Sequence, residues 1–116
     1  MKHDYDTIKK LALEFRNERD WQQFHTPKDL AEGLTIEAAE LLENFLWKTP
    51  DESRSPSAKT KKQIEHELSD ILLFLIYLCH ELNIDLFEAA ADKIKHNAEK
   101  YPVEKSKGSN KKYTEL

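Results

Sequence analysis

The sequence predicts an all-α fold, a four-helix bundle formed by a single domain. The chain has 116 residues, which gives room for one modest hydrophobic core. Two glycines and four prolines are too few for the frequent turns of a β-sandwich or β-barrel. Apolar residues instead recur at steps of three and four, which is the repeat of an amphipathic helix. Four such segments cover nearly the whole chain.

The first two predicted helices occupy the N-terminal half. The first runs over residues 4–20 and carries apolar side chains on one side: Ile8, Leu11, Ala12 and Phe15. Thr26 followed by Pro27 is typical of a helix start, because threonine caps free backbone amides and proline fits the first turn. The second predicted helix therefore runs over residues 26–47. Beyond it, Pro50 and Pro56 among serines predict a loop over residues 49–57.

The third predicted helix, residues 58–82, contains the apolar run "ILLFLIYLC" at 71–79. Because this run is apolar on every side, a four-helix monomer of this size cannot cover it fully, and we expect the protein to self-associate. Asp85 with Glu88 three residues later indicates the start of a fourth helix over residues 85–101, ended by Pro102. The short connection between the last two helices predicts antiparallel neighbours.

We expect residues 1–102 to form the domain and residues 103–116, "VEKSKGSNKKYTEL", to form a polar, lysine-rich arm. We interpret this arm as mobile, with the alternative that it orders against a partner subunit or a ligand.

Several classes of protein are excluded by composition. A formal net charge of −4 gives no general affinity for a nucleic-acid polymer or an anionic membrane. The longest apolar run is less than half of the roughly 20 residues that span a bilayer. The start of the chain lacks the apolar segment of a secretory signal, and the single cysteine, Cys79, rules out a disulfide framework. We therefore expect a cytoplasmic protein.

One carboxylate of the second helix points toward its apolar side. The apolar stripe of this helix consists of Leu30, Leu34, Ala38, Leu41 and Phe45. At about 100° per residue, Glu37 falls about 20° from Leu30, and Glu40 lies at the edge of the stripe. Glu32 and Glu43 fall on the opposite side, as ordinary solvated acids do. The third helix repeats this pattern, with Glu67 and Asp70 at the edge of its stripe.

The two pairs Glu37-x-x-Glu40 and Glu67-x-x-Asp70 can converge if the second and third helices pack antiparallel. Several buried like charges need a counter-charge, and oxygen-only ligands favour Mg²⁺ or Mn²⁺ over zinc. A di-iron site is disfavoured, because it normally needs Glu-x-x-His pairs, which are absent here. The alternative for Glu37 is a protonated or salt-bridged glutamate in the core.

These acids also carry a resemblance to a known family. Together with five further segments they resemble the MazG-type all-α nucleoside triphosphate pyrophosphohydrolases, and are most similar to the branch that includes the dCTP pyrophosphatases. The segments are "RDWQQFHTPKDL" (19–30), "WK" (47–48), "ELSDILLFL" (67–75), "KIKHNAEKYP" (93–102) and "KKYTEL" (111–116). The resemblance implies a MazG-like bundle that assembles as a homodimer or homotetramer. It also implies cleavage of a nucleoside triphosphate, dCTP or a related dNTP, into monophosphate and pyrophosphate.

The resemblance also implies residue roles. Glu37, Glu40, Glu67 and Asp70 become the catalytic metal ligands, with Mg²⁺ as the cofactor and Mn²⁺ as a possible substitute. The resemblance further implies that Trp21 and Trp47 line the pocket for the base. It implies that Lys93 contacts a phosphate and that Asn97 lies near the sugar or the base. Without the resemblance, the tryptophans could equally pack in a core or interface, and Lys93 and Asn97 would be exposed helix residues.

Two positions depart from the dCTP-preferring relatives. Ala12 stands where they carry a histidine, and Phe74 stands where they tend to carry a tyrosine. Since each change removes a polar group, the departures imply a weaker preference for cytosine. The alternative function that remains is a non-catalytic four-helix protein that senses nucleotides or binds a partner.

Overall fold

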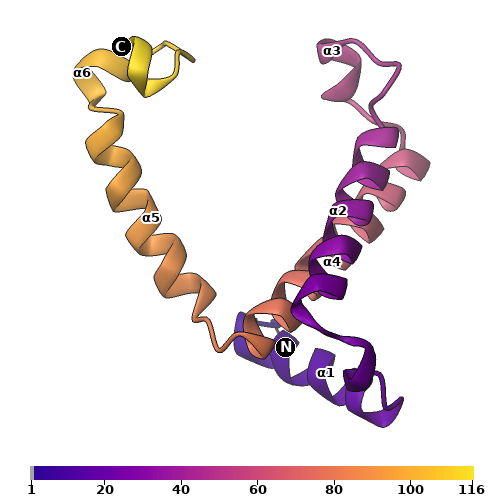
Figure 1. Ribbon diagram of the computed structural model, residues 1–116. Coiled ribbons are helices and arrows are strands. Elements are labelled where there is room, and N and C mark those ends of the chain that lie inside the picture. Colours follow the sequence, from indigo (N-terminus) through magenta and orange to yellow (C-terminus); the bar gives the residue numbers. More distant parts are fainter. Residues whose placement is uncertain (1) are drawn as a thin grey trace. The chain divides into compact units, whose positions relative to one another are not determined.

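The computed structural model describes residues 2–116, which contain helices and no strand (Figure 1). The predicted all-α class is confirmed. The chain divides into two compact units, one ending at Asn83 and one covering Ile84–Leu116. No helix among the described residues is both long enough and apolar enough to cross a membrane.

The first unit is built on two long antiparallel helices that lie side by side, α2 (Pro27–Glu43) and α4 (Ala58–Glu81) (Figure 1). Helix α1 (Tyr5–Glu18) packs against α4, and a short 3₁₀ turn, η1 (Gln22–Phe24), leads from α1 to α2. A four-residue helix, α3 (Pro50–Ser53), lies in the connection between α2 and α4.

The second unit contains α5 (Leu86–Lys100), α6 (Val103–Ser106) and a 3₁₀ turn, η2 (Tyr113–Glu115). The C-terminal arm thus carries two short helical turns. The ring of Tyr113 contacts that of Tyr101 edge-on at 6.0 Å, and the Lys100 ammonium lies 4.7 Å from the centre of the Tyr113 ring. These contacts hold η2 against the end of α5. Three expectations stay predictions. They are the domain boundary at residue 102, the packing of α5 with the other helices as a four-helix bundle, and self-association.

Each long helix begins at a side-chain cap, and the caps at Thr26 and Asp85 were predicted. Asp4, Thr26, Ser57 and Asp85 each accept a hydrogen bond from the backbone N–H three residues later. Pro27 occupies the first turn of α2, where its missing N–H costs nothing.

Two details of the sequence interpretation are wrong. The predicted loop at 49–57 contains α3, because Thr49 and Glu52 form a capping box with hydrogen bonds of 3.0 and 3.1 Å. Helix α2 ends at Glu43 instead of residue 47. Beyond that point the side-chain amide of Asn44 donates to the carbonyl oxygens of Glu40 and Leu41, and the chain continues in tight turns.

The core lies where α1, α2 and α4 meet, and its buried members are Ala12, Leu30, Ile76 and Tyr77. The hydroxyl of Tyr77 donates to the carbonyl of Ala12 at 2.9 Å, which joins α4 to α1. Part of the apolar side of α1 stays open as a groove of about 240 Å³, lined by Ile8, Leu11, Ala12, Phe15, Leu73 and Tyr77. Leu11 is 47% exposed and Phe15 is 45% exposed, so α1 covers α4 incompletely.

Candidate functional site

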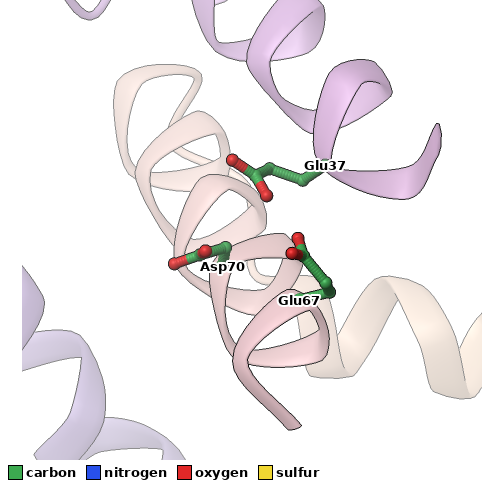
Figure 2. Close-up of side chains that lie close together, drawn as sticks. All are labelled: Glu37, Glu67 and Asp70. Carbon is green, nitrogen blue, oxygen red and sulfur yellow. The ribbon is translucent and has the colours of Figure 1, made fainter. Parts of the chain in front are cut away.

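Three carboxylates meet between α2 and α4. Glu37 comes from α2, and Glu67 and Asp70 come from successive turns of α4; one oxygen of each lies within 4.8 Å of the others. Figure 2 shows the Glu37 side chain reaching from its helix toward the two acids on the other. The two acidic pairs could converge only if their helices packed antiparallel, and this packing is present. It brings three of the four predicted ligands together.

Two of these carboxylates hold oxygen atoms that lack a partner. The Oε2 atoms of Glu37 and Glu67 are buried and accept no hydrogen bond from the described residues. None of the three acids forms an ion pair with a lysine or arginine within residues 2–116. A buried carboxylate oxygen without a donor or counter-charge is costly. Because all the facing groups are acceptors when ionised, the missing partner can be a bound cation or a proton on Glu37.

The surroundings raise the pKa of Glu37 from its usual 4.5 to about 7. Loss of water around the carboxylate is the largest cause of the raised pKa, followed by the adjacent carboxyl group of Glu67 and the charges of Glu40 and Asp70. Without a cation, Glu37 therefore carries a proton for much of the time near neutral pH. This finding explains how an acid on the apolar side of α2 is tolerated in the metal-free protein.

Glu40 lies one helical turn beyond Glu37 and is exposed. It is outside the group of three converging carboxylates, although its charge acts on Glu37. Its assignment as a fourth ligand stays a prediction. The three converging acids fit a hard divalent cation, since such ions take carboxylate oxygens and fill remaining positions with water or substrate oxygen.

The chain was also compared with known proteins. Residues 34–116 match the model of the MazG-like family. This chain belongs to the MazG-like family. It is similar to dCTP pyrophosphatase 1 of Bos taurus, with 43% identity over 114 residues, which cover 96% of this chain and 67% of the relative. The corresponding protein of Homo sapiens is 39% identical over 113 residues, covering 96% of this chain and 66% of the relative.

A solved structure supports the fold of this MazG-like chain. The crystal structure of a pyrophosphatase from Archaeoglobus fulgidus DSM 4304 matches with a TM-score of 0.81 and 38% sequence identity. The match covers 88% of this chain and 95% of the archaeal chain. The chain spans about two thirds of the length of the dCTP pyrophosphatases that it matches.

Both tryptophans of the MazG-like chain present much of their surface to solvent. Trp47 lies in the turn after α2 and is 92% exposed, which makes it unlike a core residue. Trp21 is 44% exposed and sits before η1, where its ring meets Phe15 edge-on at 5.6 Å. Lys93 and Asn97 are exposed on α5, one turn apart, in the second unit. Binding roles for these four residues stay predictions.

The two departures from the dCTP-preferring pattern are packed residues. Ala12 is buried in the core, and Phe74 lies over the backbone of Gly33.

Sequence reasoning missed Gly33, although a glycine inside a helix is a signal of close packing. It also missed the buried ion pair of Arg16 and Glu81, because 65 residues separate the two partners and no local pattern links them.

Proposed function

We propose that this protein is a metal-dependent nucleoside triphosphate pyrophosphohydrolase that converts dCTP or a related dNTP to the monophosphate and pyrophosphate. The observation that carries the proposal is the convergence of Glu37, Glu67 and Asp70 with two buried, unpartnered carboxylate oxygens. Membership of the MazG-like family, and relatives named dCTP pyrophosphatase 1, support the choice of reaction and substrate.

The cofactor that we infer is Mg²⁺, with Mn²⁺ as a substitute, because the converging ligands are all carboxylate oxygens. When bound, Mg²⁺ supplies positive charge against the phosphate oxygens and makes nearby water more acidic. In this proposal Glu37, Glu67 and Asp70 hold the ion, and the exposed Glu40 adds a fourth carboxylate at the solvent side. Water adds to the α phosphorus and the bond to the bridging oxygen of the β phosphate breaks, so pyrophosphate leaves.

The remaining predicted residues bind the substrate. The exposed indole of Trp47 offers a flat apolar face on which a base can stack, and Trp21 offers a second one. Lys93 would contact a phosphate, and Asn97 the sugar or the base. Ala12 and Phe74 lack polar side-chain groups, so we expect the preference for cytosine to be weaker than in relatives that carry histidine and tyrosine there.

Self-association is part of the proposal. The groove on α1 and the exposed Leu68 and Leu72 of α4 leave apolar surface on two helices of the first unit. A homodimer or homotetramer would cover such surface. We further infer that the protein acts in the cytoplasm, on the pool of free nucleotides.

Turnover by matched variants tests the proposal. Glu37→Gln and Asp70→Asn should each abolish release of pyrophosphate from dCTP in the presence of Mg²⁺ and leave the circular dichroism spectrum unchanged. Glu43→Gln is the control, because Glu43 ends the same helix and lies outside the converging group. Full activity of Glu37→Gln would contradict the proposal. Nucleotide binding without turnover by the unmodified protein would favour a nucleotide sensor instead.

A further inference from the structure

The ring of Phe74 on α4 fills the space beside Gly33 on α2, one turn away from the acidic cluster. A Cβ atom built on Gly33 would lie 2.6 Å from Cε1 of Phe74 and 2.7 Å from its Cζ. Real Cβ atoms essentially never approach a carbon so closely. The edge of the Phe74 ring therefore occupies the space that any other side chain at residue 33 would need.

This contact is in register with the carboxylates. Gly33 precedes Glu37 by four residues on α2, and Phe74 follows Asp70 by four residues on α4. The two helices run antiparallel (Figure 1). At about 1.5 Å per residue, the Gly33–Phe74 contact therefore lies about 6 Å along the helix axes from the level of Glu37 and Asp70. A helix is stiff over one turn, so the separation of α2 and α4 at this contact is passed on to the acids.

Local helix preference opposes glycine at this position. Glycine lowers the stability of a helix interior relative to alanine. The neighbouring small residues of α2 are alanines, at positions 31, 38 and 39. Gly33 is the exception, and it is the position that faces the Phe74 ring. Phe74 is also packed against the core cluster of Ala12, Leu30, Ile76 and Tyr77, which limits where its ring can go.

We propose that Gly33 and Phe74 form a spacing pair, which sets the separation of α2 and α4 so that Glu37 can share one divalent cation with Glu67 and Asp70. The inference rests on the metal site of the proposed function and adds two positioning residues to it. Neither residue offers a ligand atom, so both act through the carboxylates.

The test is a double-mutant cycle read out by Mn²⁺ affinity, measured by electron paramagnetic resonance. Gly33→Ala adds one methyl group at the contact, and we expect it to weaken Mn²⁺ binding about tenfold or more, the usual effect of disturbing the residues that support metal ligands. Phe74→Leu removes Cε1 and Cζ, the two atoms in the way. The double variant should therefore bind Mn²⁺ within about threefold of Phe74→Leu alone. Ala39→Gln, an enlargement at an exposed position of α2, is the control and should bind like the unmodified protein.

The outcomes separate this inference from the proposed function. If the unmodified protein binds no Mn²⁺, the proposed metal site is wrong, and the spacing pair, which depends on that site, is wrong as well. If the unmodified protein binds Mn²⁺ and Gly33→Ala binds it equally tightly, the spacing pair alone is overturned, because the ring has moved aside without consequence. A loss that Phe74→Leu does not rescue overturns it as well. If Gly33→Ala fails to fold, the double variant decides. A folded double variant that binds Mn²⁺ within about threefold of Phe74→Leu supports the inference, and an unfolded double variant overturns it.

Discussion

The carboxylates of Glu37 and Glu67 face each other across the packed helices α2 and α4, and each keeps one buried oxygen without a hydrogen-bond partner in the described chain. Such an arrangement opposes folding of the metal-free protein. It becomes favourable when a cation binds, because the charges that repel one another then share a common partner.

Glu37→Gln should therefore stabilise the metal-free protein at pH 8. The variant removes a charge that is repelled by its neighbours, and the new amide can donate to Glu67. We expect the melting temperature in EDTA to rise by about 4 °C, the shift that roughly 1 kcal/mol gives in a domain of this size. Glu43→Gln should leave it unchanged. A lower melting temperature for Glu37→Gln in EDTA would show that the ionised carboxylate contributes a favourable contact.

Stability of the metal-free protein should also depend on pH through Glu37. The pKa of this group in the folded protein, about 7, lies above its usual value of 4.5. The contribution of Glu37 to the free energy of unfolding is therefore fully present below pH 4.5 and is lost as the pH rises through 7. Urea titrations in EDTA should show a decline between pH 5 and pH 8 that is smaller in Glu37→Gln, and equal declines would contradict this cause.

Metal binding should show the opposite dependence on pH. A cation needs Glu37 ionised, so binding below pH 7 must displace its proton. We expect Mn²⁺ affinity to rise by up to about tenfold per pH unit below pH 7 and to level off above it. Calorimetry at pH 6 in buffers of different ionisation enthalpy should detect the released proton. An affinity that is constant from pH 5.5 to 8 would place the cation away from Glu37.

Glu81→Ala should strongly destabilise the first unit. The Arg16 side chain is 1% exposed, and its Nη1 donates to Oε1 of Glu81 at 2.7 Å. Removing the carboxylate leaves a buried guanidinium without its counter-charge, which costs about 3–5 kcal/mol. Urea unfolding measures this loss. Lys28→Ala breaks the exposed pair with Glu32 and should change the free energy of unfolding by less than about 0.5 kcal/mol. Similar effects of the two variants would contradict a structural role for Arg16.

Trp47→Ala should impair substrate binding and leave stability unchanged. Its side chain is 92% exposed, so truncation removes almost no packing. Loss of stacking on a base costs about 1–3 kcal/mol, which corresponds to a rise in KM of roughly fivefold or more. Steady-state kinetics with dCTP, together with thermal melting, separates the two effects. An unchanged KM would remove Trp47 from the proposed base site.

The sequence predicted most of what depends on local patterns. Caps at Thr26 and Asp85 placed helix starts within one residue, because capping uses side chains next to the backbone amides they satisfy. The convergence of Glu37 with Glu67 and Asp70 followed from helical spacing and an antiparallel arrangement. Glu40 was expected with them, but it is exposed and lies outside the three that converge.

Other features were missed, most of them because they depend on contacts between distant segments. The short helix at Pro50–Ser53 is a local exception: the prolines and serines of residues 49–57 predict a loop, although Thr49 and Glu52 can form a capping box. The meeting of Gly33 with Phe74, and of Arg16 with Glu81, requires knowledge of how α4 packs on α2 and α1. Periodicity identifies the face that a helix buries, and it does not identify the residue that lies opposite.

Phosphorus NMR of the products formed from dCTP identifies the bond that the protein cleaves. With Mg²⁺, we expect equal amounts of dCMP and pyrophosphate, no orthophosphate, and no turnover once EDTA is added. Asp70→Asn should yield neither product. Orthophosphate and dCDP as products, or turnover that persists in EDTA, would contradict the assignment of this carboxylate cluster to metal-dependent cleavage at the α phosphorus.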